Sequence, residues 1–376
     1  MFSALAILLA LFQLVSDVAD ATVDARAREA DRCVIDGDAA AAVEHCSRVI
    51  ALSSFSRSWK AGGLASRAAA LNRQGRYDDA IADLDLALRL QPGWADALYE
   101  RAYAYRARGR KEAAMADLDA VLRANPRHFE ALMVRAEIHA EAGDRRRALQ
   151  DLDAALQIDP GDAGAWGWRG QIHGRAGDDQ AAIEDFDAAL QRKPGLAWVL
   201  IDRAKAYRRL GQPDAALRDL DAAVGAERGN AHALVERGDL RLWRGEDARG
   251  IADFSSALAI EPDYLDAVWF RCSALIRVDR AHEAVADCRR AAALAPTNAG
   301  VWATFGFAYL SDGAPAEAYA AFNRALVLDA GDALARFGRS LAGAALGKPR
   351  PMLDAAAARA QQPDIEDTLQ RLGYIR

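Results

Sequence analysis

Paired carboxylates are the most frequent arrangement in this sequence that could support chemistry. The motif Asp-x-Asp occurs at residues 83–85, 117–119 and 151–153. Two carboxylates this close could bind a divalent cation or share acid and base roles in a hydrolysis. The motif recurs every 34 residues, however, and a unique active site does not repeat along a chain. We therefore expect one aspartate of each motif to serve the structure and the other to face solvent.

A series of arginines keeps a constant distance from the first aspartate of these motifs. In seven consecutive segments an aspartate follows an arginine by sixteen residues, in the pairs Arg67 and Asp83, Arg101 and Asp117, Arg135 and Asp151, Arg169 and Asp185, Arg203 and Asp219, Arg237 and Asp253, and Arg271 and Asp287. One period further on, Phe305 and Ala321 replace both members together. Such joint loss favours a direct ion pair that fixes helix register rather than one that catalyses. A bond from each aspartate to the arginine of the next segment is the alternative.

Other signals of catalysis or cofactor binding are weak. The sequence contains no G-x-x-x-x-G-K, H-E-x-x-H or G-x-S-x-G motif. His139 and His173 lie one 34-residue period apart and could share a metal ion. No third ligand keeps this spacing, so we expect two histidines at the edge of a core instead. The sequence therefore predicts no enzyme activity, no cofactor and no metal site.

The four cysteines form two pairs. Cys33 and Cys46 flank Gly37, and Cys272 and Cys288 flank a predicted turn in the same way. Two pairs, each within one predicted helical hairpin, indicate two disulfides and an oxidising compartment. Four buried free thiols are the alternative, because cysteine is also a good small core residue.

The elements that hold these residues repeat with the same period. Helix-ending prolines recur every 34 residues, with Arg228 in place of one of them, at Pro92, Pro126, Pro160, Pro194, Pro262 and Pro296. A glycine lies in the middle of almost every segment, and apolar residues fall at helical spacing on both sides of it. Each segment is thus predicted to be two helices, joined by a turn at the glycine and ended by the proline. Such a period is typical of a repeat array, in which each helix pair buries its apolar face against its neighbours.

These positions resemble the tetratricopeptide repeat. The second segment, 95–128, matches the family pattern with Leu98, Ala102, Tyr105, Ala114, Leu118 and Pro126. The resemblance implies an all-α fold, a right-handed superhelical solenoid of helix-turn-helix repeats. We assign residues 22–60 to a degenerate N-terminal repeat with the first disulfide, 61–332 to eight repeats, and 333–376 to C-terminal capping helices.

The N-terminal segment, residues 1–21, is predicted to be a signal peptide. Residues 1–15 are apolar and uncharged, and Ala-Asp-Ala at 19–21 fits a cleavage site near Ala21. The apolar run is short for a membrane span. We therefore expect a periplasmic or secreted protein with no transmembrane span after cleavage; anchoring by an uncleaved N-terminus is the alternative. Residues 33–50 also resemble the start of exported bacterial tetratricopeptide proteins.

Ligands of this family usually lie on the concave face, which the first helix of each repeat (helix A) lines. Register places two patches there. The first consists of Tyr99, Tyr103 and Met133, and the second of Trp198, Lys205, Arg208, Arg209, Trp243, Trp269 and Arg277. Tryptophan, tyrosine and arginine are frequent binding anchors, and cations beside aromatic rings would suit an extended peptide with acidic groups. Packing of these rings between adjacent helices is the alternative.

The functional prediction follows from these patches. We expect a non-enzymatic scaffold that binds an extended peptide or a partner protein on its concave face. An envelope glycan-binding or polymer-binding module that uses the tryptophan-lined groove is the alternative. The formal net charge of −6 argues against a nucleic-acid partner. No particular oligomeric state is predicted.

Overall fold

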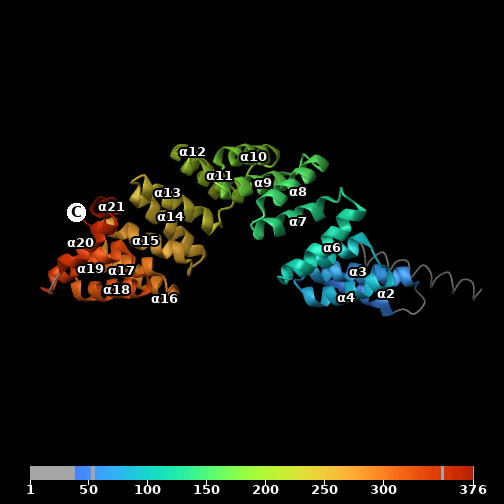
Figure 1. Cartoon of the computed structure of the whole chain (residues 1–376), viewed down its shortest axis with the longest axis horizontal. Coiled ribbons are helices and arrows are strands. Elements are labelled where there is room, and N and C mark those ends of the chain that lie inside the picture. Colours follow the sequence, from blue (N-terminus) through green and yellow to red (C-terminus); the bar gives the residue numbers. More distant parts are fainter. Residues whose placement is uncertain (1–38, 52–55, 349–350, 376) are drawn as a thin grey trace, which may run out of the picture. The chain divides into compact units, whose positions relative to one another are not determined.

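The fold is an all-α helical repeat solenoid. A computed structural model describes residues 39–51, 56–348 and 351–375, and within these ranges it contains twenty helices and no strand (Figure 1). Consecutive helices pack against one another from α2 to α8 and from α10 to α20. The predicted fold class is therefore confirmed. The predicted signal peptide and Cys33 lie outside the described residues.

The helices follow the 34-residue period closely. Their bounds are α2 Ala39–Ala51, α3 Arg57–Arg73, α4 Tyr77–Leu90, α5 Ala95–Ala107, α6 Lys111–Ala124, α7 Phe129–Glu141, α8 Arg145–Ile158, α9 Ala163–Arg175, α10 Asp179–Arg192, α11 Ala197–Arg209, α12 Pro213–Ala226, α13 Ala231–Trp243, α14 Asp247–Ile260, α15 Leu265–Arg277, α16 Ala281–Leu294, α17 Ala299–Ser311, α18 Pro315–Leu328, α19 Ala333–Ala345, α20 Pro351–Gln361 and α21 Ile365–Arg371. Odd-numbered helices from α3 to α19 are the A helices of the repeats, and the even-numbered helix after each is its B helix.

Proline is not required to end a B helix in this chain. Every B helix from α4 to α18 ends two residues before the position of the periodic proline. This holds for α12 and α18 too, although Arg228 and Ala330 stand at that position. The turn between the two helices of a repeat, in contrast, requires a residue that adopts a positive φ. Its glycines take φ near +70° to +80°, and Asp279 takes 62° where the glycine is missing.

The helices of a repeat are joined by a contact between residues of matched size. In sequence, the first member of this contact is the residue after the arginine of each arginine–aspartate pair, and the second follows it by sixteen positions. The two are alanine with leucine, glycine with phenylalanine, or cysteine with cysteine. In the structure, a Cβ atom added to Gly238 would lie 2.6 Å from Cε1 of Phe254, and one added to Gly306 would lie 2.5 Å from Cε1 of Phe322. Both phenylalanines are fully buried. The large B-helix side chain thus fits only because helix A has no side chain there.

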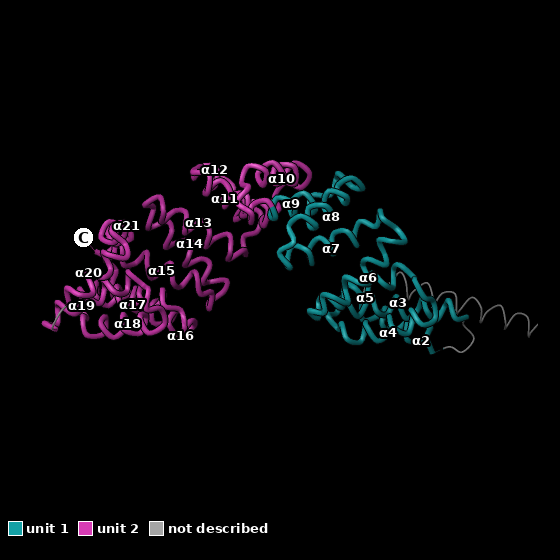
Figure 2. The backbone as a smooth tube through the Cα atoms, viewed as in Figure 1, with its two compact units in different colours: residues 1–172 teal, residues 173–376 magenta. Residues whose placement is uncertain are grey.

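The chain divides into two compact units, residues 1–172 and 173–376, shown in teal and magenta in Figure 2. In unit 2, one hydrophobic core runs from Ala231 in α13 to Leu369 in α21. The segment predicted to contain capping helices holds a further helix pair, α19 and α20, before the short α21. Of the helices in the described ranges, none is both long and apolar enough to cross a membrane.

Candidate functional site

The arginine–aspartate series forms a ladder of bidentate ion pairs inside the repeats. Nε and Nη2 of Arg101 donate to the two carboxylate oxygens of Asp117, both at 2.8 Å. The same two-donor bond joins Arg67 to Asp83, Arg135 to Asp151, Arg203 to Asp219, Arg237 to Asp253, and Arg271 to Asp287. These aspartates are only 4% to 8% exposed. Arg169 belongs to unit 1 and Asp185 to unit 2, and that pair stays a prediction.

The second aspartate of each motif has a side chain that is 40% to 54% exposed, and it accepts a hydrogen bond as well. Nη1 of Arg101 donates to Asp85 of the preceding repeat at 2.6 Å. The equivalent bonds are Arg135 to Asp119, Arg169 to Asp153, Arg203 to Asp187, and Arg237 to Asp221. The physical reason is the planar guanidinium group, which keeps a third donor free after it has engaged one carboxylate. The bond within a repeat and the bond to the neighbouring repeat therefore coexist.

The ladder resumes in the C-terminal segment, which sequence reasoning missed. Arg339 in α19 donates to both oxygens of Asp354, at 2.8 and 2.7 Å, and to Oδ1 of Asn323 at 2.9 Å. Arg339 lies one period after Phe305, so its position was readable from the sequence. Its partner Asp354 follows by fifteen residues rather than sixteen. The sixteen-residue spacing of the other pairs therefore did not indicate this one. Hydrogen bonds to carboxylates raise the pKa of Arg101 and of Arg339, so both groups stay charged.

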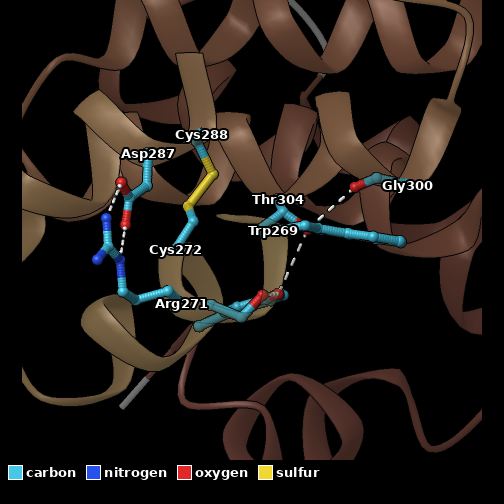
Figure 3. The surroundings of a disulfide bond; sticks show 9 residues. Trp269, Arg271, Cys272, Asp287, Cys288, Gly300 and Thr304 are labelled. Atoms are coloured by element: carbon cyan, nitrogen blue, oxygen red, sulfur yellow. Dashed lines mark hydrogen bonds and ion pairs between the residues drawn. A yellow bond between two sulfur atoms is a disulfide. The ribbon is translucent and has the colours of Figure 1, made fainter. Parts of the chain in front are cut away.

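The second cysteine pair is a disulfide in the core of unit 2. Cys272 in α15 and Cys288 in α16 are bonded with a Cα–Cα distance of 5.5 Å, and both are fully buried. They occupy the size-matched positions held by Gly238 and Phe254 in the preceding repeat. Figure 3 shows the bond beside the Arg271–Asp287 pair. Cys46 is buried in α2, but because Cys33 lies outside the described residues the first pair stays a prediction.

The first predicted patch is partly absorbed into the core of unit 1. Tyr99 and Met133 pack against the same buried cluster, and the Tyr99 ring lies 5.3 Å from that of His128. Burial raises the pKa of Tyr99 to about 12. Tyr103 is more exposed and contacts Tyr77 edge-on, with ring centroids 6.4 Å apart. This patch therefore offers one accessible ring.

The cations of the second patch are paired with carboxylates. Each lies beside an acidic group, in the pairs Lys205 with Glu236 at 2.9 Å, Arg208 with Asp239 at 2.5 Å, Arg209 with Asp179 at 2.5 Å, and Arg277 with Asp247 at 2.9 Å. An acidic ligand would have to displace these carboxylates. The local charge thus gives an acidic peptide no clear advantage.

Three of the seven residues of this patch come together in one cleft. The cleft has a volume of about 850 Å³ and is lined by Trp243, Trp269 and Arg277, with other residues from α15, α17, α19 and α21. Trp243 is 68% exposed at the end of α13. Trp198, Lys205, Arg208 and Arg209 do not line the cleft. A volume of this size is typical of ligand sites, which span about 300 to 1,000 Å³.

Hydrogen bonds fix one wall of the cleft. Nε1 of Trp269 donates to Oγ1 of Thr304 at 2.9 Å, and the Thr304 hydroxyl donates to the carbonyl oxygen of Gly300 at 3.0 Å (Figure 3). Asp332 accepts from the backbone N–H of Ala335 at the start of α19, and burial raises the pKa of its carboxyl group. Trp269 is therefore half-buried and positioned, whereas Trp243 presents a free ring face.

The C-terminal tail, defined as residues 372–375, forms another wall, and nothing in the repeat pattern indicated it. The Tyr374 ring stacks on Phe307 with centroids 4.6 Å apart. Its hydroxyl lies 3.1 Å from Oγ of Ser273 and 3.4 Å from Oγ1 of Thr304. Burial raises the pKa of Tyr374, so the phenol is neutral. Ser273 and Phe307 lie at the same helix A position in neighbouring repeats, which is the position of Tyr103 and Lys205 in the predicted patches.

Comparison with known proteins agrees with the fold. The family model described as tetratricopeptide repeat matches residues 66–128, 99–163, 135–197 and 201–264, which together cover more than half of the chain. No curated protein matches. A tetratricopeptide repeat protein from Parabacteroides merdae ATCC 43184 is similar in structure, with a TM-score of 0.52 and 22% identity over 63% of this chain and 93% of that one.

A second similar structure, that of the APC/C hetero-tetramer Cut9–Hcn1, has a TM-score of 0.53 and 13% identity over 89% of this chain and 80% of that one. At such identities the likeness concerns the fold alone. The family match rests on sequence, and it covers the ladder from Arg67 to Asp253. The chain belongs to the tetratricopeptide repeat family.

Proposed function

We propose that this protein is a non-enzymatic scaffold that binds an extended segment of a partner protein in the cleft of unit 2. The observation that carries the proposal is the 68% exposure of Trp243 in a concave site. A large aromatic ring left uncovered beside a cleft is a typical interaction anchor, because burying it contributes much of the free energy of binding.

The lining of the cleft favours an uncharged anchor on the partner. Its surface is formed largely by aromatic and aliphatic side chains, including Phe270, Leu242 and Leu334. The nearby Arg277 and Asp239 already have partners of opposite charge. We therefore infer that an aromatic or aliphatic side chain, rather than a carboxylate, enters the cleft.

We also propose that the protein works in an oxidising compartment, outside the cytoplasm. The disulfide between Cys272 and Cys288 supports this proposal, since such bonds persist mainly in secreted and periplasmic proteins. The signal peptide predicted at residues 1–21 would export the protein to such a compartment.

The test compares two exposed tryptophans on the same chain. Trp243→Ala should lose partners that the wild-type protein captures from envelope extracts, while Trp59→Ala, in which the replaced ring is 51% exposed in unit 1, should keep them. Capture is quantified by mass spectrometry at a fixed salt concentration. Identical partner sets for Trp243→Ala and wild type would contradict the proposal. Trp243-dependent binding to envelope glycans without any protein would support the glycan-binding alternative instead.

A further inference from the structure

The C-terminal tail forms a wall of the cleft and places Tyr374 in a subsite there, as a ligand would place a side chain. It continues α21 through a turn in which the backbone N–H of Tyr374 donates to the carbonyl oxygen of Leu369 at 2.9 Å. The side chain of Tyr374 contacts two neighbouring A helices, α15 and α17. We propose that the tail is a built-in occupant of the cleft, and that the cleft selects partner segments with a tyrosine in the place of Tyr374. The inference rests on the proposed function, because it specifies the chemistry of the same partner.

A rigid aromatic surface receives the tyrosine ring. Phe307 is fully buried, and its ring is held edge-on against Phe322 with centroids 4.9 Å apart. The ring of Tyr374 lies nearly parallel to that of Phe307, at an interplanar angle of 19°. Because the Phe307 ring is already fixed, binding of an aromatic side chain does not have to order it. Little free energy of binding is therefore lost.

The hydroxyl environment distinguishes tyrosine from phenylalanine. The Thr304 hydroxyl donates to the carbonyl oxygen of Gly300 and accepts from Nε1 of Trp269. Toward the tyrosine hydroxyl it can therefore act only as an acceptor. Ser273 is then the group that donates to the phenol oxygen, at 3.1 Å. The site therefore offers one acceptor and one donor, which match a neutral phenol. A phenylalanine in this place would leave the hydroxyl groups of Ser273 and Thr304 without the hydrogen bonds that the tyrosine makes.

The backbone before the tyrosine is recognised too. Nη1 of Arg277 donates to the carbonyl oxygen of Arg371 at 3.3 Å. Gly373 has φ of +70°, and a Cβ atom there would lie 2.6 Å from Cγ of Arg277. A side chain before the tyrosine would clash with the arginine. The preferred sequence is therefore Gly-Tyr, with the glycine in a left-handed turn like that of Gly373.

Tethering makes the tail a competitor of such a segment. Residues of the tail and of α21 line the cleft, so a segment bound there lies beside Tyr374. A short tether gives a local concentration on the order of mM. The intact chain should therefore bind a free Gly-Tyr segment much more weakly than a chain whose tail has lost its anchor.

The experiment uses a fluorescent peptide with the sequence Gln-Arg-Leu-Gly-Tyr-Ile-Arg, which is that of residues 370–376. Fluorescence anisotropy measures its binding to the full-length wild type and to full-length Tyr374→Ala. We expect at least about tenfold tighter binding to Tyr374→Ala, and an intermediate affinity for the isosteric Tyr374→Phe. The control Tyr319→Ala, a tyrosine on α18 that does not line the cleft, should bind the peptide like wild type.

A peptide with phenylalanine in place of tyrosine tests the hydroxyl contacts. It should bind Tyr374→Ala several-fold more weakly than the tyrosine peptide, and adding Ser273→Ala should reduce this difference. Equal affinity of the tyrosine peptide for wild type, Tyr374→Phe and Tyr374→Ala, or no binding to any of them, would overturn the inference. If Trp243→Ala still abolished partner capture in that case, the proposed function would stand and only the role of the tail would fall.

Discussion

Each arginine of the ladder divides its donors between two aspartates in different surroundings. Arg101 directs two donors to the buried Asp117 and one to Asp85, whose side chain is 40% exposed. Removing one member of a buried pair leaves the other charge unpaired, at a cost of about 3 to 5 kcal/mol. Exposed pairs contribute about 0 to 1 kcal/mol because solvent screens them. The two aspartates of one motif should therefore differ in their effect on stability.

The substitution Asp117→Ala should lower the free energy of unfolding by about 3 kcal/mol, and Asp85→Ala by less than about 1 kcal/mol. Urea unfolding followed by circular dichroism gives both values. The pair Asp151→Ala and Asp119→Ala provides an independent repetition one period later, around Arg135. Similar losses for the two aspartates of a motif would show that burial does not control these ion pairs.

The sequence allowed the bonds within repeats to be predicted, but not those between repeats. The sixteen-residue spacing indicated the partner of Arg101 directly. Asp85 also precedes Arg101 by sixteen residues, so the second bond has the same spacing in the opposite direction. That signal did not decide whether one guanidinium group reaches both carboxylates. The answer depends on the distance between adjacent helix pairs, which the pattern does not contain.

The packing of one element against the next follows a rule of matched size. Gly238 lies against Phe254, whereas alanine lies with leucine at the same two positions in Ala102 and Leu118. Both combinations fill a similar space between the helices of a repeat. A methyl group added at Gly238 would overlap the ring of Phe254, since 2.6 Å is far below an ordinary carbon–carbon contact.

Gly238→Ala should therefore lower the free energy of unfolding by about 1 to 3 kcal/mol, although alanine favours helix formation. Adding Phe254→Leu should recover part of this loss, because it recreates the alanine–leucine pair. Thermal unfolding of the two single variants and the double variant measures the coupling. Gly225→Ala is the matched control, since no atom lies within 4 Å of its added Cβ atom in α12, and it should not destabilise the protein. Additive effects at positions 238 and 254 would contradict the rule.

At the scale of the whole molecule, the repeat period predicts most of the fold and little of the cleft. The period indicated the helices, their ends and the faces they bury. The tail was not predictable in this way, because it occurs once and contacts Ser273 from 101 residues away. The ion pair between Arg339 in α19 and Asp354 in α20 was missed for a related reason, since the ladder is interrupted at Phe305 just before it. Features that break the repeat form the candidate site, and a periodic pattern does not specify where they lie.

The disulfide tests how far a local constraint acts along the chain. In a repeat array each helix pair contacts mainly its neighbours, so a stabilising bond should act near its own position. Cys272 and Cys288 close a loop with a sequence separation of 16, for which the chain-entropy model gives about 3 kcal/mol. The double substitution Cys272→Ala and Cys288→Leu removes the bond but installs the alanine–leucine pair of other repeats. It therefore separates the covalent constraint from the packing.

We expect this double variant to fold and to lose protection against amide hydrogen exchange in α15 and α16, with smaller losses in α14 and α17. Protection in α5 and α6 of unit 1 should not change, because a bond within unit 2 restrains only local opening. Hydrogen exchange followed by mass spectrometry, in non-reducing buffer, resolves these helices. An equal loss of protection in α5 and α6 would mean that the chain opens as one cooperative body. Unchanged protection in α15 and α16 would mean that matched packing alone holds this repeat, and that the disulfide adds little to its stability.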